Sequence, residues 1–557
     1  MTTSRWIGGG RSHRSAPAEW GARADVDDFR PPWEGFEEFF ATRVDDSSVA
    51  LVHYADGAAA ARWTGGEWHA EAWSVARRLA RAGVRSGDDV AIVARNSPTT
   101  LLAAFACWCL GAVFVPLDPR DSAQRNHDIL AACDSPCIIG GPDSVTDSMT
   151  PARARVLSAD DIFDVGVPAP DDIVRTPGAA AGLDVPALRL HTSGTSGTPK
   201  PIVLTMRSLL INCDAMTRAF GWNHDTMTLT ILPISHANGL VISSILPWFT
   251  GGSSVLVDRF RTRTFWRIAA ETSATACSLV PTVMEYLLAD TANAAGPRTT
   301  LREVISGSGP LRPAAAAEFE KRFGVPVRQL YGLSETSAVL TVTPRLGIGA
   351  LSGDARASVG PTVPHARVSV LRPDGTECAE HERGEIVARG GMLMLGYHGL
   401  LQATAEAFDG GWFHTGDRGY YRVGPDGQPW FILEGRTREV ISRGGSTILP
   451  QHVDQVLDEH PSVARAATFG FANRWYGYEV AAVVVRRAPV QAEELIAWCR
   501  ERMGFEAAPK VVMFDDELPL TTVGKIRRRS LADHYADRLA SYWDHQFRPG
   551  HDDAWRR

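Results

Sequence analysis

This sequence lacks the long apolar run, the excess of positive charge and the metal-spaced cysteines that mark three common classes of protein. No stretch of its 557 residues approaches the ~20 apolar residues of a membrane-spanning helix, and residues 1–20 hold no apolar signal-peptide core. Its net charge of -7 offers no surface that seeks a polyanion. We therefore expect an untargeted cytoplasmic protein, with neither a membrane nor a nucleic acid as partner.

The eight cysteines are dispersed along the chain. Cys107 is close to Cys109, and Cys133 to Cys137, but these pairs fall in apolar stretches and come with no histidines at zinc spacing. We expect reduced thiols in the core, with no disulfide and no metal site.

Lysine is almost absent from the chain. Only Lys200, Lys321, Lys510 and Lys525 occur, within a total of 57 lysines and arginines. A drift toward arginine explains the scarcity but does not explain which lysines remain. Because Lys200 and Lys525 lie in glycine-flanked loops, these two loops are the first candidates for chemistry.

The first loop, Leu190–Pro201, reads LHTSGTSGTPKP. Glycines alternating with small hydroxyl residues let backbone N–H groups turn inward around an oxyanion, and Lys200 adds a mobile positive charge. The spacing differs from that of the nucleotide-binding P-loop, because Thr198 and Pro199 separate the last glycine from the lysine. The composition taken alone fits a phosphate cradle and a surface linker equally well.

The length exceeds what one hydrophobic core supports, so two or more domains are expected. Short apolar runs alternate with helical patterns from about residue 73 to residue 330, which is typical of parallel strands joined by crossover helices. A β-rich stretch follows, and a compact α+β unit begins near Arg436. We predict an α/β fold with doubly wound sheets and a β subdomain, followed by a small mobile C-terminal domain. The predicted boundaries are a flexible tail 1–30, a large domain 31–435, a small domain 436–540 and a tail 541–557.

The expected elements can be placed from these patterns. In the large domain, we expect strands at 90–93, 113–116, 228–232, 254–257, 276–279, 303–305 and 327–330, and helices at 72–82, 99–111, 206–220, 264–272, 282–289 and 314–323. In the small domain, we expect helices at 451–460 and 492–503, and strands at 466–471, 480–485 and 510–514.

Four further stretches carry residues suited to chemistry: Tyr331–Glu335 (YGLSE), Trp412–Asp417 (WFHTGD), Gly435–Gly445 (GRTREVISRGG) and Leu518–Arg528 (LPLTTVGKIRR). With the first loop, and in this order, they resemble the acyl-adenylate-forming (ANL) superfamily, which includes acyl-CoA synthetases, peptide-synthetase adenylation domains and luciferases. The resemblance covers the chain from about Ser74 to Leu531.

The resemblance implies a two-step reaction that uses ATP and Mg²⁺. A substrate carboxylate attacks the α-phosphorus of ATP and expels pyrophosphate, and a nucleophile then displaces AMP from the acyl-adenylate after the small domain rotates. The implied acceptor is CoA or the phosphopantetheine of a carrier protein, and relatives suggest a possible homodimer.

The resemblance also implies roles for individual residues. Lys525 matches the catalytic lysine, Arg438 occupies the hinge position, and His236 matches the residue that gates the substrate carboxylate. Glu335 matches the magnesium ligand, with Thr195 as a second metal contact, since hard oxygen donors suit this cation. The residues implied to hold the nucleotide are Thr192, Ser193, Gly194, Thr195, Ser196 and Lys200 around the phosphates, Ser308, Gly309, Tyr331 and Gly332 around adenine, Ser334 at the α-phosphate, and Asp417 and Arg436 at the ribose.

The nature of the acid follows from the pocket segments. In the amino-acid-activating members that the chain resembles, an aspartate pairs with the α-ammonium group. The corresponding stretch here, Leu232–Gly239, holds no acidic residue, so the resemblance disfavours α-amino acids. The expected lining, at 234–240, 280–286, 306–310 and 331–339, is apolar with a few hydroxyls and favours a fatty or aromatic acid, in the setting of natural-product biosynthesis.

The acceptor is less constrained, because Pro201, Ser446, Thr447 and His452 depart from the family pattern. A thiol acceptor is the leading hypothesis. A nitrogen acceptor is the alternative, in an amide synthetase or in a diazotase that activates nitrite for an aromatic amine. A third alternative is a nucleotide-binding regulator without turnover.

Overall fold

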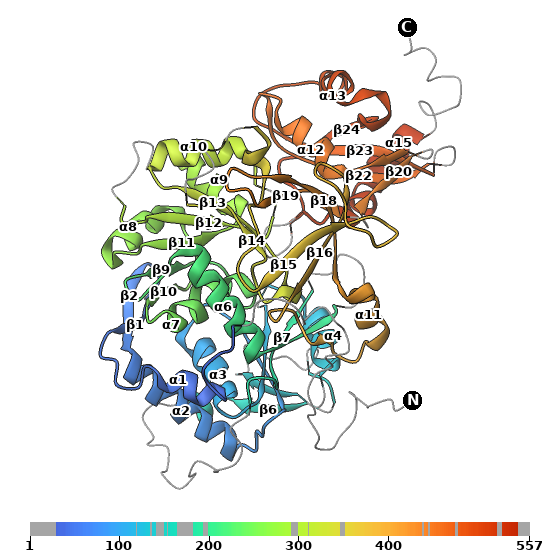
Figure 1. Cartoon of the computed structure of the whole chain (residues 1–557). Helices are drawn as coiled ribbons and strands as arrows, with labels where there is room; N and C mark the ends of the chain where they lie inside the picture. The colour runs from blue at the N-terminus through green and yellow to red at the C-terminus, as the bar shows by residue number, and fades with distance from the viewer. Residues whose placement is uncertain are drawn as a thin grey trace.

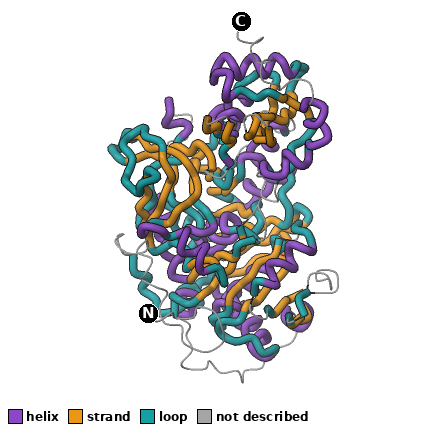
Figure 2. Tube along the Cα trace, turned by 90° about the vertical axis from the view of Figure 1, so that its right-hand side faces the viewer, coloured by secondary structure: helices purple, strands orange, loops and turns teal. Residues whose placement is uncertain are grey.

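The computed structural model describes fifteen stretches of the chain: residues 29–118, 120–133, 136–140, 150–152, 154–163, 182–192, 199–290, 299–309, 311–345, 351, 353–436, 439–443, 446–473, 477–520 and 526–543. The sheets of the body lie together, and the C-terminal unit, orange to red in Figure 1, sits above them. The side view in Figure 2 shows the same stacking of the C-terminal unit on the body.

An eight-stranded sheet in the described part of the body has the order β14-β13-β12-β11-β9-β10-β1-β2. Neighbours from β13 to β1 run parallel, while β2 and β14 pair antiparallel at the two edges. Its strands are β1 (Val49–Ala55), β2 (Ala58–Thr64), β9 (Met227–Thr230), β10 (Ser253–Val257), β11 (Ala276–Leu279), β12 (Glu303–Ser306), β13 (Val327–Tyr331) and β14 (Thr341–Val342). Three helices with apolar faces pack against this sheet: α8 (Thr262–Thr272), α9 (Pro281–Ala289) and α10 (Pro313–Phe323).

A seven-stranded sheet has the order β17-β8-β7-β4-β3-β5-β6 and is parallel from β7 to β6. Its strands are β3 (Asp89–Val93), β4 (Val113–Leu117), β5 (Cys137–Gly140), β6 (Arg155–Ser158), β7 (Pro186–His191), β8 (Pro201–Thr205) and β17 (Gly396–Tyr397). The remaining helices of the body are α1 (Phe36–Ala41), α2 (Gly65–Arg81), α3 (Pro98–Cys109), α4 (Ala123–Ala131), α5 (Ala159–Phe163), α6 (Met206–Phe220), α7 (Leu246–Phe249) and α11 (Leu401–Ala407).

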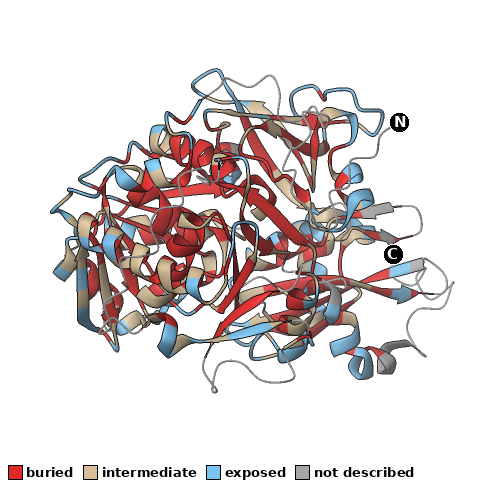
Figure 3. Cartoon of the chain, turned by 90° about the horizontal axis from the view of Figure 1, so that it is seen from below, coloured by how far each residue is buried: buried red, intermediate tan, exposed pale blue. Residues whose placement is uncertain are grey.

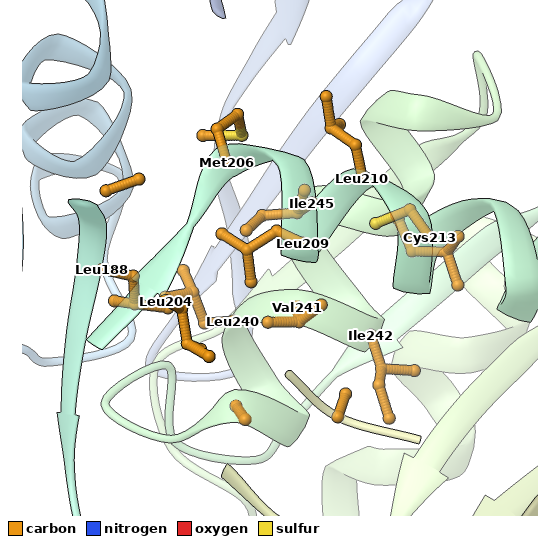
Figure 4. Packing of buried hydrophobic residues seen from close by; sticks show 14 of the residues in the cluster. Leu188, Leu204, Met206, Leu209, Leu210, Cys213, Leu240, Val241, Ile242 and Ile245 are labelled. Carbon is orange, nitrogen blue, oxygen red and sulfur yellow. The ribbon is translucent and has the colours of Figure 1, made fainter. Parts of the chain in front are cut away.

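Helix α6 shows how local sequence sets the bounds of an element. Thr205 and Ser208 form a reciprocal capping box at its start, and Gly221 ends it in a left-handed conformation at φ 72°. Its buried face includes Leu209 and Leu210, which pack with Leu204 of β8 and with the π-helix η2 (Asn238–Ile245) (Figure 4). This apolar cluster joins α6 to the two sheets.

The β-rich stretch forms a four-stranded sheet of order β15-β16-β18-β19. Its strands are β15 (Ala366–Leu371), β16 (Gly384–Gly390), β18 (Phe413–Val423) and β19 (Pro429–Arg436), and short 3-10 helices lie at η4 (Ser334–Thr336), η6 (Gly353–Ala357) and η7 (Asp409–Gly411).

The C-terminal unit has its own five-stranded sheet and its own core. Its strands are β20 (Ile441–Arg443), β21 (Ser446–Ile448), β22 (Val463–Asn473), β23 (Gly477–Arg486) and β24 (Val511–Phe514). Its helices are α12 (Pro450–Asp458), α13 (Ala492–Ala507), η9 (Arg528–Ser530), α14 (Leu531–His534) and α15 (Ala536–Trp543).

The predicted α/β class is confirmed, and so are the parallel strands of the body. Strand Ala276–Leu279 and helix Met206–Phe220 have the predicted bounds. The π-helix η2 was not expected, because its mostly apolar sequence shows no clear helical period. Figure 3 shows the strands of the body largely buried.

All eight cysteines are described as free thiols, and all but Cys109 are buried, as expected for thiols in the core. Among the described helices, none combines the length and the apolar character needed to cross a bilayer.

Candidate functional site

The loops that follow β12 and β13 carry four of the predicted nucleotide contacts and the predicted magnesium ligand. Ligands of open α/β sheets bind at the carboxyl ends of the strands, and here these ends are Ser306 and Tyr331. The loop after β13 is compressed, since a Cβ on Gly332 would lie 2.0 Å from the Ala338 carbonyl oxygen. Only glycine fits there. The same two loops also carry Ser308, which is held at φ 64°, Gly309, Ser334 and Glu335.

Tyr331, at the end of β13, contacts Asp417, which lies in β18 of the β-rich sheet. The Tyr331 hydroxyl donates to Asp417 Oδ2 at 2.7 Å, and Arg436 Nε lies 3.3 Å from Oδ1 of the same carboxylate. Burial and the Asp417 charge raise the pKa of Tyr331 well above its usual value, so its hydroxyl stays a donor. The three predicted adenine and ribose contacts therefore form one cluster, joined by a hydrogen bond and an ion pair at Asp417.

The two ends of the predicted phosphate loop are held together. The Thr192 N–H donates to the Lys200 carbonyl at 3.1 Å, and the Lys200 N–H donates to Thr192 Oγ1 at 3.1 Å. Arg125 Nη2 donates to the Thr192 carbonyl at 2.9 Å. Burial, with Arg189 and Arg125 nearby, lowers the pKa of His191 to about 3, so this imidazole is neutral beside the loop. These hydrogen bonds hold Lys200, at the end of the loop, next to Thr192, which directly follows β7 at the start of the loop.

Tyr397 connects the phosphate-loop lysine with the predicted magnesium ligand. Its hydroxyl donates to Glu335 Oε1 at 3.1 Å, and Lys200 Nζ lies 4.8 Å from the centre of its ring. Tyr397 lies in strand β17, which pairs antiparallel with β8. Because β8 begins directly after Lys200, this pairing places Tyr397 beside the lysine. The backbone of Glu335 is fixed as well, because its carbonyl accepts from the Met394 N–H at 2.7 Å.

His236 lies against a buried carboxylate. Its Nε2 is 3.1 Å from Asp118 Oδ2, and Ser235 Oγ donates to the same oxygen at 3.1 Å. Arg120 binds Asp118 in a bidentate pair at 2.9 and 2.7 Å. Burial alone would raise the pKa of this carboxyl group, but the hydrogen bonds from His236 and Arg120 hold the pKa well below its usual range. A permanently ionised Asp118 therefore orients His236.

Several predicted site residues lie outside the described part of the chain: Ser193, Gly194, Thr195, Ser196, Arg438 and Lys525. Their roles stay predictions. Among the described residues, no group of three or more His, Cys, Asp or Glu side chains could hold a metal by itself. A magnesium ion at Glu335 would thus take its other oxygen ligands from outside this set of side chains, such as water and the nucleotide phosphates.

Sequence reasoning missed Asp118 and Tyr397. Asp118 lies in the stretch Gly111–Pro119, which contributed to the resemblance, but its contact with His236 spans 118 positions. Tyr397 follows Gly396 in a two-residue strand, too short to give a periodic signal. Nothing in the local sequence distinguishes either residue.

The sequence matches two family descriptions that together extend over most of the chain. Residues 39–398 match "AMP-binding enzyme", and residues 452–525 match "AMP-binding enzyme C-terminal domain". The chain belongs to the AMP-binding enzyme family. The resemblance to the acyl-adenylate-forming superfamily is confirmed, and with it the predicted class of AMP-forming ligase.

Curated relatives of this AMP-binding enzyme include CoA ligases. It is 34% identical over 487 residues to sulfoacetate–CoA ligase of Cupriavidus necator, covering 83% of this chain and 91% of that protein. It is 30% identical over 465 residues to 2-succinylbenzoate–CoA ligase of Bacillus licheniformis, covering 83% of this chain and 92% of the relative.

Solved structures agree with this placement. ATP-bound MatB of Rhodopseudomonas palustris superposes with a TM-score of 0.80 at 26% identity, covering 90% of this chain and 98% of that one. The o-succinylbenzoate coenzyme A synthetase of Bacillus subtilis, in complex with ATP and magnesium, gives a TM-score of 0.77 at 26% identity, covering 89% and 99%.

Proposed function

We propose that this AMP-binding enzyme is an acyl-CoA synthetase that activates a small-molecule carboxylic acid with ATP. The carboxylate oxygen would bond to the α-phosphorus as the bond to pyrophosphate breaks. The CoA thiolate would then attack the acyl carbon, and AMP would leave. The observation that carries this proposal is the contact of Tyr397 with both Lys200 and Glu335, because it unites a phosphate-binding cation with a hard oxygen donor.

The donor set fits ATP with magnesium. Glu335 would hold the ion, which when bound neutralises phosphate charge, and Lys200 would bind the departing pyrophosphate. Asp417 would accept hydrogen bonds from the ribose hydroxyls, since an acceptor-rich carboxylate suits two donors. Tyr331, with Ser308 and Gly309 opposite, would stack on adenine, and its hydroxyl supports Asp417 at 2.7 Å.

The remaining nucleotide residues complete the proposed site. Gly332 would keep the backbone close to adenine, Ser334 would contact the α-phosphate, and Arg436 would bind the ribose or phosphate. Lys525 would enter in the adenylating orientation and stabilise the charge that develops on the carboxylate and α-phosphate. Arg438 would absorb the backbone change when the small domain turns.

The acid we propose has an apolar body, as in an aromatic acid, and a hydrogen-bond acceptor away from its carboxylate. Asn238 follows His236 by two residues and accepts from Ser278 Oγ at 2.6 Å, while its buried Nδ2 has no partner among the described residues. A buried amide donor needs an acceptor, which a substrate oxygen would supply. The relatives named for sulfoacetate and 2-succinylbenzoate support this polar end.

CoA is the acceptor we favour, because the curated relatives are named CoA ligases. A carrier-protein phosphopantetheine offers the same thiol chemistry. Because ATP and CoA are the proposed co-substrates, we propose the cytoplasm as the place of reaction.

The test is pyrophosphate release over paired acids, such as benzoate with hydroxybenzoate and hexanoate with a dicarboxylate, followed by CoA, an amine or nitrite in turn. We expect acid-dependent pyrophosphate release and CoA-dependent AMP release, with the oxygenated member of each pair preferred. AMP release that depends on an amine, or pyrophosphate release that requires nitrite, would replace the proposal with a nitrogen acceptor. Absence of turnover with every acid would support a regulator.

A further inference from the structure

Asp417 lies in a bulge of strand β18. Glu385 of β16 pairs with Arg418, and Val387 pairs with His414, so one residue of β16 faces three of β18. The three are Thr415, Gly416 and Asp417, with Gly416 at the left-handed φ of 72°. Bulges near active sites re-aim a side chain, and this one turns the buried Asp417 toward Tyr331 and Arg436.

Both carboxylate oxygens of Glu385 hold this bulge. Oε1 accepts from the Gly416 N–H at 3.0 Å, and Oε2 lies 2.9 Å from His414 Nδ1. The Thr415 hydroxyl donates to the Ile386 carbonyl at 2.6 Å and accepts from the Asp417 N–H at 3.0 Å. Each residue from His414 to Asp417 is therefore tied, directly or through Thr415, to Glu385 or its neighbour.

His414 is placed between two acceptors. Its Nδ1 faces the Glu385 carboxylate, and its Nε2 is 3.2 Å from the Asp409 carbonyl oxygen. Neither partner can donate, so both ring nitrogens must carry hydrogen for both bonds to form, which is the imidazolium form. The hydrogen bond to Glu385 raises the pKa of His414, and the charge of Asp409 adds to this.

Other charged groups near the bulge are already engaged. Arg389 of β16 lies over the Trp412 ring at 4.0 Å, and Arg418 of β18 has its Nε 4.0 Å from Glu434. On α11, which packs on β18, Glu406 accepts from Gln402 at 3.1 Å. Glu385 and Asp409 are thus the acidic groups that bear directly on His414.

We propose that Glu385 and His414 act together as positioning residues that aim Asp417 at the ribose of the nucleotide, and that this aim requires protonated His414. The inference rests on the proposed function of Asp417. Above its raised pKa, His414 loses one donor, the bulge loses one of its restraints, and the ribose contact weakens. Below that pKa the contact is complete.

The test is calorimetric binding of AMP and 2′-deoxy-AMP at about pH 6.5 and about pH 9. The ratio of the two dissociation constants isolates the ribose contact, because ionisation of the phosphate affects both probes alike. For the natural protein we expect a ratio of about ten at the lower pH, falling toward about two at the higher pH.

Glu385→Gln should give a ratio near two at both pH values, because the neutral amide no longer favours the imidazolium. Glu382→Gln is the matched control, since this glutamate precedes the same strand, pairs with Arg372 and should leave the ratio and its pH response unchanged. His414→Gln is the second variant, expected to show no pH response. Thermal unfolding identifies any variant that fails to fold.

The outcomes separate the two proposals. If the natural protein binds neither probe, the proposed nucleotide site is wrong, and the positioning role falls with it. If it binds AMP more tightly than 2′-deoxy-AMP but folded Glu385→Gln and His414→Gln keep its ratio and pH response, the positioning role alone is wrong. An equal loss of affinity for both probes also contradicts it, because a purely structural role would weaken both.

Discussion

Asp118→Asn should impair use of the acid while sparing use of ATP. Asp118 is 3% exposed, and its Oδ2 lies 3.1 Å from both Ser235 Oγ and His236 Nε2. Asparagine has the same shape but only one acceptor oxygen and no charge. Whichever way the amide is oriented, one set of donors on the former carboxylate loses its acceptor.

The magnitude follows from which contacts are shielded from water. The Arg120 side chain is 45% exposed, so its ion pair contributes little once solvent screening is counted. The loss then comes mainly from the charge-assisted bond to His236, which is worth about 2 kcal/mol. This corresponds to about a 30-fold fall in kcat/KM for the acid.

The assay is acid-dependent ATP–pyrophosphate exchange, with the acid varied at saturating ATP and then ATP varied at saturating acid. KM for ATP should stay within about twofold, because Asp417 and Tyr331 are untouched. Asp184→Asn, which removes an exposed partner of Arg207, is the matched control. An unchanged kcat/KM for the acid, or an equal loss for ATP, would refute the role of Asp118 in orienting His236.

The pH response of this contact has a definite sign. Because the pKa of Asp118 is lowered in the folded protein, its contribution to stability is present above the pKa of the unfolded chain, at about 3.9, and is lost only as the pH falls through the lower folded value. Asp118 therefore adds no pH dependence at neutral or alkaline pH. His414 differs, since its raised pKa makes its contribution disappear as the pH rises.

Three further variants test other parts of the molecule. Lys525→Ala should slow exchange about 100-fold, or about 3 kcal/mol, as for other transition-state donors; undiminished exchange would contradict its catalytic role. Tyr397→Phe removes the donor to Glu335 but keeps the ring beside Lys200. It should raise KM for magnesium–ATP about three- to tenfold, and an unchanged KM would separate Tyr397 from the phosphate site. Leu209→Ala, in the fully buried face of α6, should lower the free energy of unfolding by about 2–5 kcal/mol in denaturant titrations; a loss under about 1 kcal/mol would mean that this core repacks.

Elements with strong local signals could be predicted closely. Helix α6 has a capping box at Thr205, a continuous apolar face and a glycine directly after it, and its predicted bounds are those observed. Strand β11 is a short, mostly apolar run that follows Thr275 and ends shortly before Pro281, and its bounds also agree. The π-helix η2 could not be predicted in this way, since this mostly apolar segment has no clear helical period to read.

In the candidate site, too, some residues could be predicted from local sequence and others could not. Lys200, Glu335, Asp417 and His236 could be named from motifs, because glycine, hydroxyl and charged residues at fixed spacing suit phosphate and ribose chemistry. The residues that contact them in the folded protein could not be named from the sequence. Tyr397 reaches Glu335 across 62 positions only because β17 pairs with β8.

The sequence by itself thus determined the fold class, several central parallel strands and helices of the body, and the residue types available for adenylation chemistry, because these depend on periodicity, caps and short motifs. Tertiary structure alone decided that Asp118 orients His236, that Tyr397 links Lys200 to Glu335, and that Glu385 holds the bulge of Asp417. The physical reason is that strand order and register decide which distant side chains meet. A hydrogen bond needs its two atoms within about 3 Å, a condition that no local pattern encodes.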